Sequence, residues 1–216
     1  YLGSDCRSVL EIAEHTYCLC NKEPLRLPPG VKNGKCSRCS HKKLNGLFAA
    51  LPYKERSLTR TLIRQFKYEP YVKSLAPVLA GIVTEHLILT KNNIDQLWSN
   101  GILIPVPLEK TRLKNRGYNQ AQELAKELSK VLAIPVVADT LIKIKPTRPQ
   151  MKLSAEERQE NLKNAFVIKN HVQIKGRKIF LVDDVYTTGS TMEECAKVLK
   201  EVGVKQVWGI VIAREG

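Results

Sequence analysis

Two adjacent acids, Asp183 and Asp184, end an apolar run and precede a loop rich in hydroxyl side chains, in the stretch "IFLVDDVYTTGSTMEE". Carboxylates can accept hydrogen bonds from a vicinal diol, and hydroxyls can donate to phosphate oxygens. Gly189 permits positive φ, which brings backbone N–H groups at the start of the next helix close to an anion. The pattern predicts a sugar-phosphate site, with the acids on the ribose hydroxyls and the loop on the 5′-phosphate: Thr187, Thr188, Gly189, Ser190 and Thr191.

Two simpler interpretations explain less of this stretch. A capping box, Ser190 with Glu193 or Thr191 with Glu194, accounts for one hydroxyl and one glutamate but not for two adjacent acids. A Walker B strand also ends in carboxylates, but its partner motif G-x-x-x-x-G-K-[ST] does not occur in the sequence. We therefore favour the sugar-phosphate interpretation.

The elements that position these residues follow from apolar spacing. Helical periodicity and caps predict helices over residues 58–68, 72–88, 119–133, 154–166 and 191–203. The helix over 154–166 begins with a capping box of Ser154 and Glu157. Continuous apolar runs predict buried strands over residues 101–108, 178–185 and 204–213. Strands that alternate with helices indicate an α/β fold with a mostly parallel sheet covered on both faces. Ligands of such sheets bind beyond the carboxyl ends of the strands, where the two acids lie.

The bulk composition describes a chain of 216 residues with 35 Lys+Arg against 21 Asp+Glu and a net charge of +14. Such an excess attracts nucleic acid, phosphorylated metabolites or acidic lipid. No apolar run reaches the roughly 20 residues of a membrane helix, and no secretory signal is visible. We expect a cytoplasmic protein without membrane insertion. The chain begins at Tyr1 rather than Met, as expected if an upstream piece is missing.

Residues 1–45 hold five of the six cysteines, and we expect them to form a cysteine-rich module separate from a domain over residues 46–216. Cys36 and Cys39 form a C-x-x-C pair that is typical of metal knuckles. Cys18 and Cys20 are separated by only one residue, so Cys6, His15 and His41 remain alternative ligands. We predict a structural Zn²⁺ site made from four thiolates: Cys18, Cys20, Cys36 and Cys39. Metal-free cysteines are the alternative, and structural disulfides are not expected in the cytosol.

Three strings resemble a known family: "IFLVDDVYTTGST", "IPVPLEKTRLKNRGYNQAQELA" and "RPQMKLSAEERQENLKNAF". The first is similar to the phosphoribosyl pyrophosphate signature of type I phosphoribosyltransferases, and the others are similar to the ComF family, which is associated with DNA uptake in competent bacteria. The resemblance implies a type I phosphoribosyltransferase-like (Rossmann-like) sheet with a small N-terminal zinc-ribbon-like module. It also implies binding of phosphoribosyl pyrophosphate with Mg²⁺, displacement of pyrophosphate by a nucleophile, and a helicase-type competence protein as partner.

Arg112 and Arg116 follow the predicted strand 101–108, and we expect them to hold pyrophosphate, because a guanidinium fork fits phosphate oxygens. A solvated basic loop is the alternative interpretation of this segment. Arg148 and Arg158 lie in a stretch that resembles the family's mobile segment over the site, and they are weaker candidates for phosphate contact.

Two functions stay open from the sequence. The first is a phosphoribosyltransferase that acts on an unidentified nucleophile. The second is a non-catalytic protein that binds single-stranded DNA on the same scaffold, since basic surfaces with stacking aromatics suit such binding. Its candidate residues are Arg60, Arg64, Phe66, Lys67, Tyr68, Tyr71 and Lys73, although Phe66 falls on the apolar side of its helix.

Overall fold

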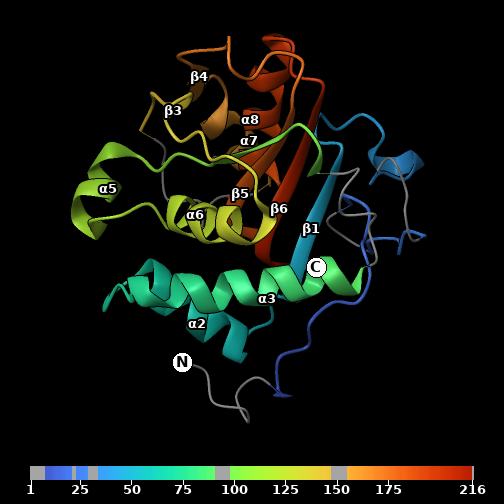
Figure 1. Cartoon of the computed structure of the whole chain (residues 1–216), viewed down its shortest axis with the longest axis vertical. Coiled ribbons are helices and arrows are strands. Elements are labelled where there is room, and N and C mark those ends of the chain that lie inside the picture. Colours follow the sequence, from blue (N-terminus) through green and yellow to red (C-terminus); the bar gives the residue numbers. More distant parts are fainter. Residues whose placement is uncertain (1–7, 21–22, 29–33, 91–97, 147–154, 216) are drawn as a thin grey trace.

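The computed structural model describes residues 8–20, 23–28, 34–90, 98–146 and 155–215, to which all structural statements below refer. A central sheet of four parallel strands has the order β1-β6-β5-β2 (Figure 1). Its strands are β1 (Gly46–Pro52), β6 (Gln206–Arg214), β5 (Lys178–Tyr186) and β2 (Gly101–Pro105). A separate antiparallel pair consists of β3 (Leu141–Lys143) and β4 (Phe166–Ile168).

Helices cover both faces of the central sheet, as Figure 1 shows. One layer contains α2 (Leu58–Lys67), α3 (Ala76–Leu89) and α6 (Gln120–Leu132). The other contains α7 (Ala155–Leu162) and α8 (Ser190–Glu201). Three short helices connect elements: η1 (Ser37–Cys39), η2 (Lys73–Leu75) and α5 (Lys110–Arg116). This architecture confirms the expected α/β fold, and none of the described helices is long and apolar enough to cross a bilayer.

Alternation along β5 gives the molecule two apolar cores. Phe180 and Val182 pack into the core beneath α3 and α6, whereas Ile179 and Leu181 pack into the core beneath α8. Successive side chains of a strand point to opposite faces of its sheet. Asp183 and Asp184 continue these two series, so the adjacent acids face different helical layers.

Two helices are fixed near the carboxyl ends of the strands by their capping residues. Asn119 accepts a hydrogen bond from Ala121 N (3.0 Å) and donates one to the carbonyl of Val106 (3.0 Å), which fastens the start of α6 just beyond β2. Ser57 Oγ accepts from Arg60 N (3.2 Å) at the start of α2. The last residue of α2 is Lys67, which reaches β5 as described below.

The structure corrects three expectations about individual elements. Residues 46–52 form β1, and residues 141–143 and 166–168 form β3 and β4, none of which we had predicted. The segment around Arg112 and Arg116, for which a solvated basic loop was the alternative interpretation, forms α5, which ends where Gly117 takes φ 81°. The helix expected to run to Phe166 ends at Leu162, because Asn164 adopts φ 54° and leaves the helical region. The expected cap Ser154 lies outside the described residues.

Candidate functional site

The acids lie where β5 outruns its neighbour β2. The β2 register ends at Pro105 opposite Val182, followed by a single hydrogen bond from Val106 N to the carbonyl of Val182 (2.9 Å). On its other side β5 stays paired with β6 as far as Tyr186. A proline at the end of β2 cannot donate to a ladder, which favours an early end to the pairing. Asp183 and Asp184 therefore lie at an open edge beyond the carboxyl end of β2.

Asp184 is buried and paired with a lysine from α2. Its side chain is 3% exposed, and Lys67 Nζ lies 3.0 Å from Oδ1 and 3.0 Å from Oδ2. Only the contact with Oδ1 has hydrogen-bond geometry, so the buried Oδ2 accepts no hydrogen bond from the described residues. Burial lowers the pKa of Lys67, but the carboxylates of Asp184 and then Asp183 outweigh this effect and leave its pKa raised. Lys67 therefore stays positively charged beside the Asp184 Oδ2 acceptor, which has no hydrogen bond from the described residues.

Asp183 has a different environment on the opposite face of β5. It is half-buried, and its Oδ1 accepts a hydrogen bond from Asp184 N (2.8 Å). Burial, followed by the adjacent Asp184 carboxylate, raises the pKa of Asp183 to about 7, against the opposing charges of Lys67 and Lys143. Burial, followed by the nearby Arg112 guanidinium, lowers the pKa of Lys143 on β3. Basic side chains thus approach the acid pair from both layers.

The loop after β5 has the glycine conformation that we predicted. Gly189 occupies the N-cap of α8 with φ 80°. A Cβ there would lie 2.3 Å from Tyr186 Oη, so no side chain fits without moving the tyrosine. Thr188 Oγ1 lies 2.9 Å from Ser190 Oγ and accepts a hydrogen bond from Ser190 N (3.4 Å). The loop is tight, lined with hydroxyls, and set at the positive end of a helix of 12 residues.

The two capping boxes considered for α8 do not explain its acids. The N-cap is Gly189, which has no side chain, rather than Ser190. Glu193 accepts hydrogen bonds from Lys43 N (2.7 Å) and Leu44 N (3.3 Å), and Glu194 accepts one from Asn164 N (2.8 Å). Both glutamates therefore hold other segments of the chain.

The two arginines of α5 lie beyond the end of β2, on the same edge of the sheet as the acids. Arg112 Nε is 3.8 Å from Glu109 Oε2, and its side chain is 40% exposed. Arg116 donates to Gln120 Oε1 and lies over the ring of Tyr68 at 6.0 Å, while its buried Nε has no partner among the described residues. Arg148 lies outside the described residues, as does the side chain of Arg158.

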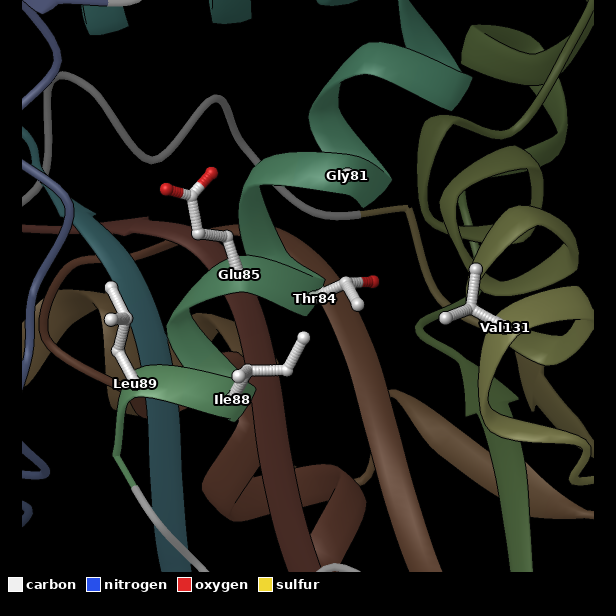
Figure 2. Close-up of a pocket in the computed structure, with 6 residues that line it drawn as sticks. All are labelled: Gly81, Thr84, Glu85, Ile88, Leu89 and Val131. Atoms are coloured by element: carbon white, nitrogen blue, oxygen red, sulfur yellow. The ribbon is translucent and has the colours of Figure 1, made fainter.

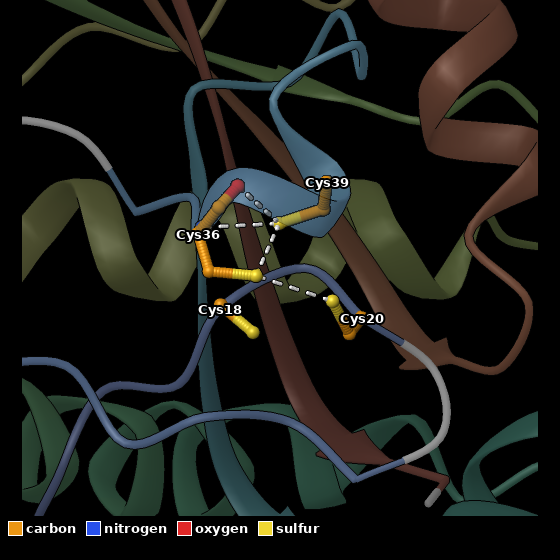
Figure 3. A group of neighbouring side chains, drawn as sticks. All are labelled: Cys18, Cys20, Cys36 and Cys39. Atoms are coloured by element: carbon orange, nitrogen blue, oxygen red, sulfur yellow. Dashed lines mark hydrogen bonds between the residues drawn. The ribbon is translucent and has the colours of Figure 1, made fainter.

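Four cysteine side chains converge near the carboxyl end of β6 (Figure 3): Cys18, Cys20, Cys36 and Cys39. All four sulfurs lie within 4.8 Å of one another, with Cys20 and Cys36 at 3.5 Å and Cys36 and Cys39 at 3.7 Å. Tetrahedral zinc with Zn–S bonds of about 2.3 Å requires neighbouring sulfurs about 3.8 Å apart. The cluster can therefore hold a metal ion despite its C-x-C spacing.

The surroundings of this cluster also suit a metal. Burial opposes ionisation of Cys36, but hydrogen bonds with Cys20 and Cys39 outweigh it and lower the pKa of Cys36 to about 6. A thiolate is the form of cysteine that binds metal. His15 and His41 do not belong to the described cluster, and Cys6 lies outside the described residues. The remaining cysteine of the described residues, Cys195, lies on α8 and is fully buried in the core beneath it.

A shallow groove of about 330 Å³ lies between α3 and α6 (Figure 2). Its lining is Gly81, Thr84, Glu85, Ile88, Leu89 and Val131. This lining contains one acid and no cation, so it does not suit a phosphate. Both helices run back from the carboxyl edge of the sheet, and their late residues line the groove. It is therefore separate from the acid pair.

Sequence reasoning missed Lys67 and Lys143 as members of the site. Lys67 had been assigned to a DNA-binding surface, but it pairs with Asp184 across 117 positions of the chain. Phe66, from the same set, is fully buried, and Lys73 pairs with Glu123 at 3.2 Å. A basic residue at the last position of an amphipathic helix is too common a pattern to have indicated this role.

Comparison with known proteins identifies the family of the chain. A model of the phosphoribosyl transferase domain matches residues 113–216. Competence protein F of Haemophilus influenzae is 47% identical over 160 residues, covering 70% of this chain and 67% of the relative. DNA utilization protein YhgH of Salmonella typhi is 32% identical over 191 residues, covering 84% and 79%. Competence protein ComFC of Streptococcus pneumoniae is 27% identical over 211 residues, covering 95% and 84%. The chain therefore belongs to the ComF family, with a phosphoribosyl transferase domain over its C-terminal part and a four-cysteine cluster at its N-terminal end.

Proposed function

We propose that the chain binds phosphoribosyl pyrophosphate with Mg²⁺ at the edge formed by Asp183, Asp184 and residues 187–191. The observation that carries the proposal is the buried Asp184 Oδ2, an acceptor without a hydrogen bond from the described residues, on the strand that leads into a glycine loop at a helix N-terminus. A ribose hydroxyl would donate to that oxygen, and a 5′-phosphate would suit the positive end of α8 beside the loop. The names of the relatives support a role in DNA uptake and utilization.

Each group has a definite task in this proposal. Asp183 and Asp184 accept from the ribose hydroxyls, and the loop binds the 5′-phosphate. Arg112 and Arg116 hold pyrophosphate with their guanidinium groups, and Lys67 keeps Asp184 in place. Mg²⁺, carried mainly by pyrophosphate and diol oxygens, would neutralise charge on the leaving group. The protein contributes position and electrostatic stabilisation to the transfer of the phosphoribosyl group to a nucleophile.

We also propose that residues 1–45 form a zinc-binding module and residues 46–216 the phosphoribosyltransferase-like domain. Four thiolates leave no open position on a tetrahedral zinc, so the ion would be structural. The start of β1 at Gly46 supports a boundary at this point.

Isothermal titration of the full chain with phosphoribosyl pyrophosphate and Mg²⁺ tests the first proposal. Binding should weaken at least tenfold in Asp183→Asn, because the amide replaces one diol acceptor by a donor. Glu201→Gln, which removes an exposed acid at the far end of α8, is the matched control and should bind like the parent. Absence of binding by the parent chain at millimolar ligand would refute the proposal.

A second proposal is binding of single-stranded DNA, supported by the net charge of +14. The structure leaves a smaller surface than the sequence suggested: Arg60, Arg64 and Tyr68, the last 45% exposed and beneath Arg116. Oligonucleotide affinity should fall steeply with salt, and Tyr68→Ala should weaken it. Affinity that does not depend on salt would rule out this mode of binding.

A further inference from the structure

Tyr186 lies between the cysteine cluster and Gly189 of the loop over residues 187–191, called the phosphate loop below. It is 1% exposed, and its Oη is the atom that a Cβ at Gly189 would meet. The same hydroxyl donates to the carbonyl of Leu19 (3.4 Å), which stands between Cys18 and Cys20. The position of this hydroxyl therefore depends on the segment that carries two of the four sulfurs.

Arg214, the last residue of β6, makes a second link to that segment. It donates to the carbonyl of Cys18 (2.8 Å) and to the carbonyl of Cys20. Its guanidinium lies 5.5 Å from the centroid of the Tyr186 ring, to which it is paired across the strands. One arginine thus contacts the backbone of both cysteines and the ring beneath the loop.

The other cysteine pair is connected to the same loop from the opposite side. Lys42 N donates to the carbonyl of Cys39 (3.1 Å), and Lys42 Nζ donates to Tyr186 Oη (3.1 Å). The next two backbone amides, of Lys43 and Leu44, donate to Glu193 in the first turn of α8. Both halves of the cluster are therefore connected to Tyr186, at the end of β5 just before the loop.

We propose that Tyr186 and Arg214 are positioning residues that couple the cysteine cluster to the phosphate loop, so that a metal ion in the cluster and a sugar phosphate at the loop bind cooperatively. Neither residue needs to touch the phosphate. A metal draws the Cys18–Cys20 and Cys36–Cys39 segments together, which fixes Tyr186 Oη against Gly189 and holds the loop in its tight conformation. The proposal rests on the proposed sugar-phosphate site, and it adds an effect of the metal on that site.

Thermodynamic reciprocity supplies a measurement that does not depend on enzymatic activity. The zinc-loaded full chain is mixed with a chromogenic chelator, with and without saturating ribose 5-phosphate and without Mg²⁺, which the chelator would also bind. At equilibrium, we expect saturating ribose 5-phosphate to lower the Kd for zinc, read from the zinc taken up by the chelator, by at least about fivefold. Titration of the zinc-loaded and zinc-stripped chains with ribose 5-phosphate should show a loss of affinity of the same order on stripping.

Two variants test the assigned residues. Arg214→Lys keeps the charge but cannot reach two carbonyls with one planar group, and Tyr186→Phe keeps the ring but loses the hydroxyl. Each should still bind one zinc, as counted by native mass spectrometry, while the effect of ribose 5-phosphate on the Kd for zinc falls toward onefold. Arg177→Lys is the matched control, because Arg177 also donates to a backbone carbonyl, that of Asn100 (3.2 Å), at the other end of the sheet.

The outcomes separate this inference from the proposed function. Equal affinity for ribose 5-phosphate with and without zinc overturns the coupling and leaves the sugar-phosphate site intact. No binding even to the zinc-loaded chain refutes the site itself. Hydrogen exchange of the stripped chain distinguishes coupling from unfolding: faster exchange in residues 187–190 with β2 still protected supports the inference, whereas equal loss of protection in both overturns it.

Discussion

Replacing Lys67 with Met should destabilise the protein far more than the same change at another paired lysine. Lys67 is 29% exposed and Asp184 is 3% exposed, so the substitution leaves a buried carboxylate without its partner. Loss of one partner of a buried pair costs about 3–5 kcal/mol, and the partial exposure of Lys67 places the expected cost near the lower value. For a chain of this size, about 3 kcal/mol lowers Tm by about 6–12 °C.

Lys73→Met is the matched control for this experiment. Lys73 pairs with Glu123 at 3.2 Å, close to the Lys67–Asp184 distance, but it is 57% exposed. An exposed pair contributes about 0–1 kcal/mol, so its Tm should fall by less than about 4 °C. Thermal melts followed by circular dichroism measure both variants. The double variant Lys67→Met with Asp184→Asn should recover part of the loss, because it removes the unpaired charge.

Equal Tm shifts in Lys67→Met and Lys73→Met would refute this reasoning, since they would show that burial of Asp184 does not govern the energy of its pair. A double variant no more stable than Lys67→Met would refute it as well, because the loss would then come from packing of the lysine stem rather than from charge.

Three further predictions concern Asp183, Gly189 and the cysteine cluster. Because the pKa of Asp183 is raised from 3.8 to about 7, the folded state binds the proton more tightly than the unfolded state, so the free energy of unfolding should fall as pH rises from about 4 to about 7. Urea melts of Asp183→Asn should show a free energy of unfolding that depends less on pH over this range. The same pH dependence in the variant and the parent would contradict the raised pKa of Asp183. Gly189→Ala should weaken ribose 5-phosphate binding in titrations, because its Cβ would meet Tyr186. Gly203→Ala is the control: Gly203 has a similar φ of 84°, but the nearest neighbour of its Cβ is the flexible Lys175 stem at 3.4 Å, so binding should stay intact. Equal losses of affinity in the two variants would count against the Tyr186 contact. Cys36→Ser should lower the bound zinc from one to none by mass spectrometry, while Cys195→Ala should retain it; zinc retained by Cys36→Ser would exclude Cys36 as a ligand.

The sequence predicted the parts of this fold that local patterns specify. The central strands β2, β5 and β6 are continuous apolar runs, and α2, α3 and α6 have clear apolar spacing or caps, so each was placed within a few residues. β1 was missed because "GLFAALP" lacks the alternation and the β-branched residues that mark strands. β3 and β4 were missed because each has only three residues and owes its conformation to the other.

The site was predictable where one segment carries it and not where distant segments meet. Asp183, Asp184 and Gly189 belong to one stretch, so the sequence alone predicts that they lie in the same site. The Lys67–Asp184 pair requires the end of α2 to meet β5, and the non-equivalence of the two acids requires knowing that β5 remains extended through both. The cysteine cluster is an exception, because it was predicted although two distant segments form it. Its four sulfurs converge despite the irregular C-x-C spacing, since Arg214 and Tyr186 hold the backbone of the Cys18–Cys20 segment.

The alternation of β5 at the acid pair has a consequence for how the two cores behave. Neighbouring side chains on a strand point to opposite faces of the sheet. A small molecule bound by both carboxylates is therefore connected both to the α2 layer and to the α8 layer. Such a ligand would connect the two helical layers through the sheet, so its binding should stabilise both apolar cores together.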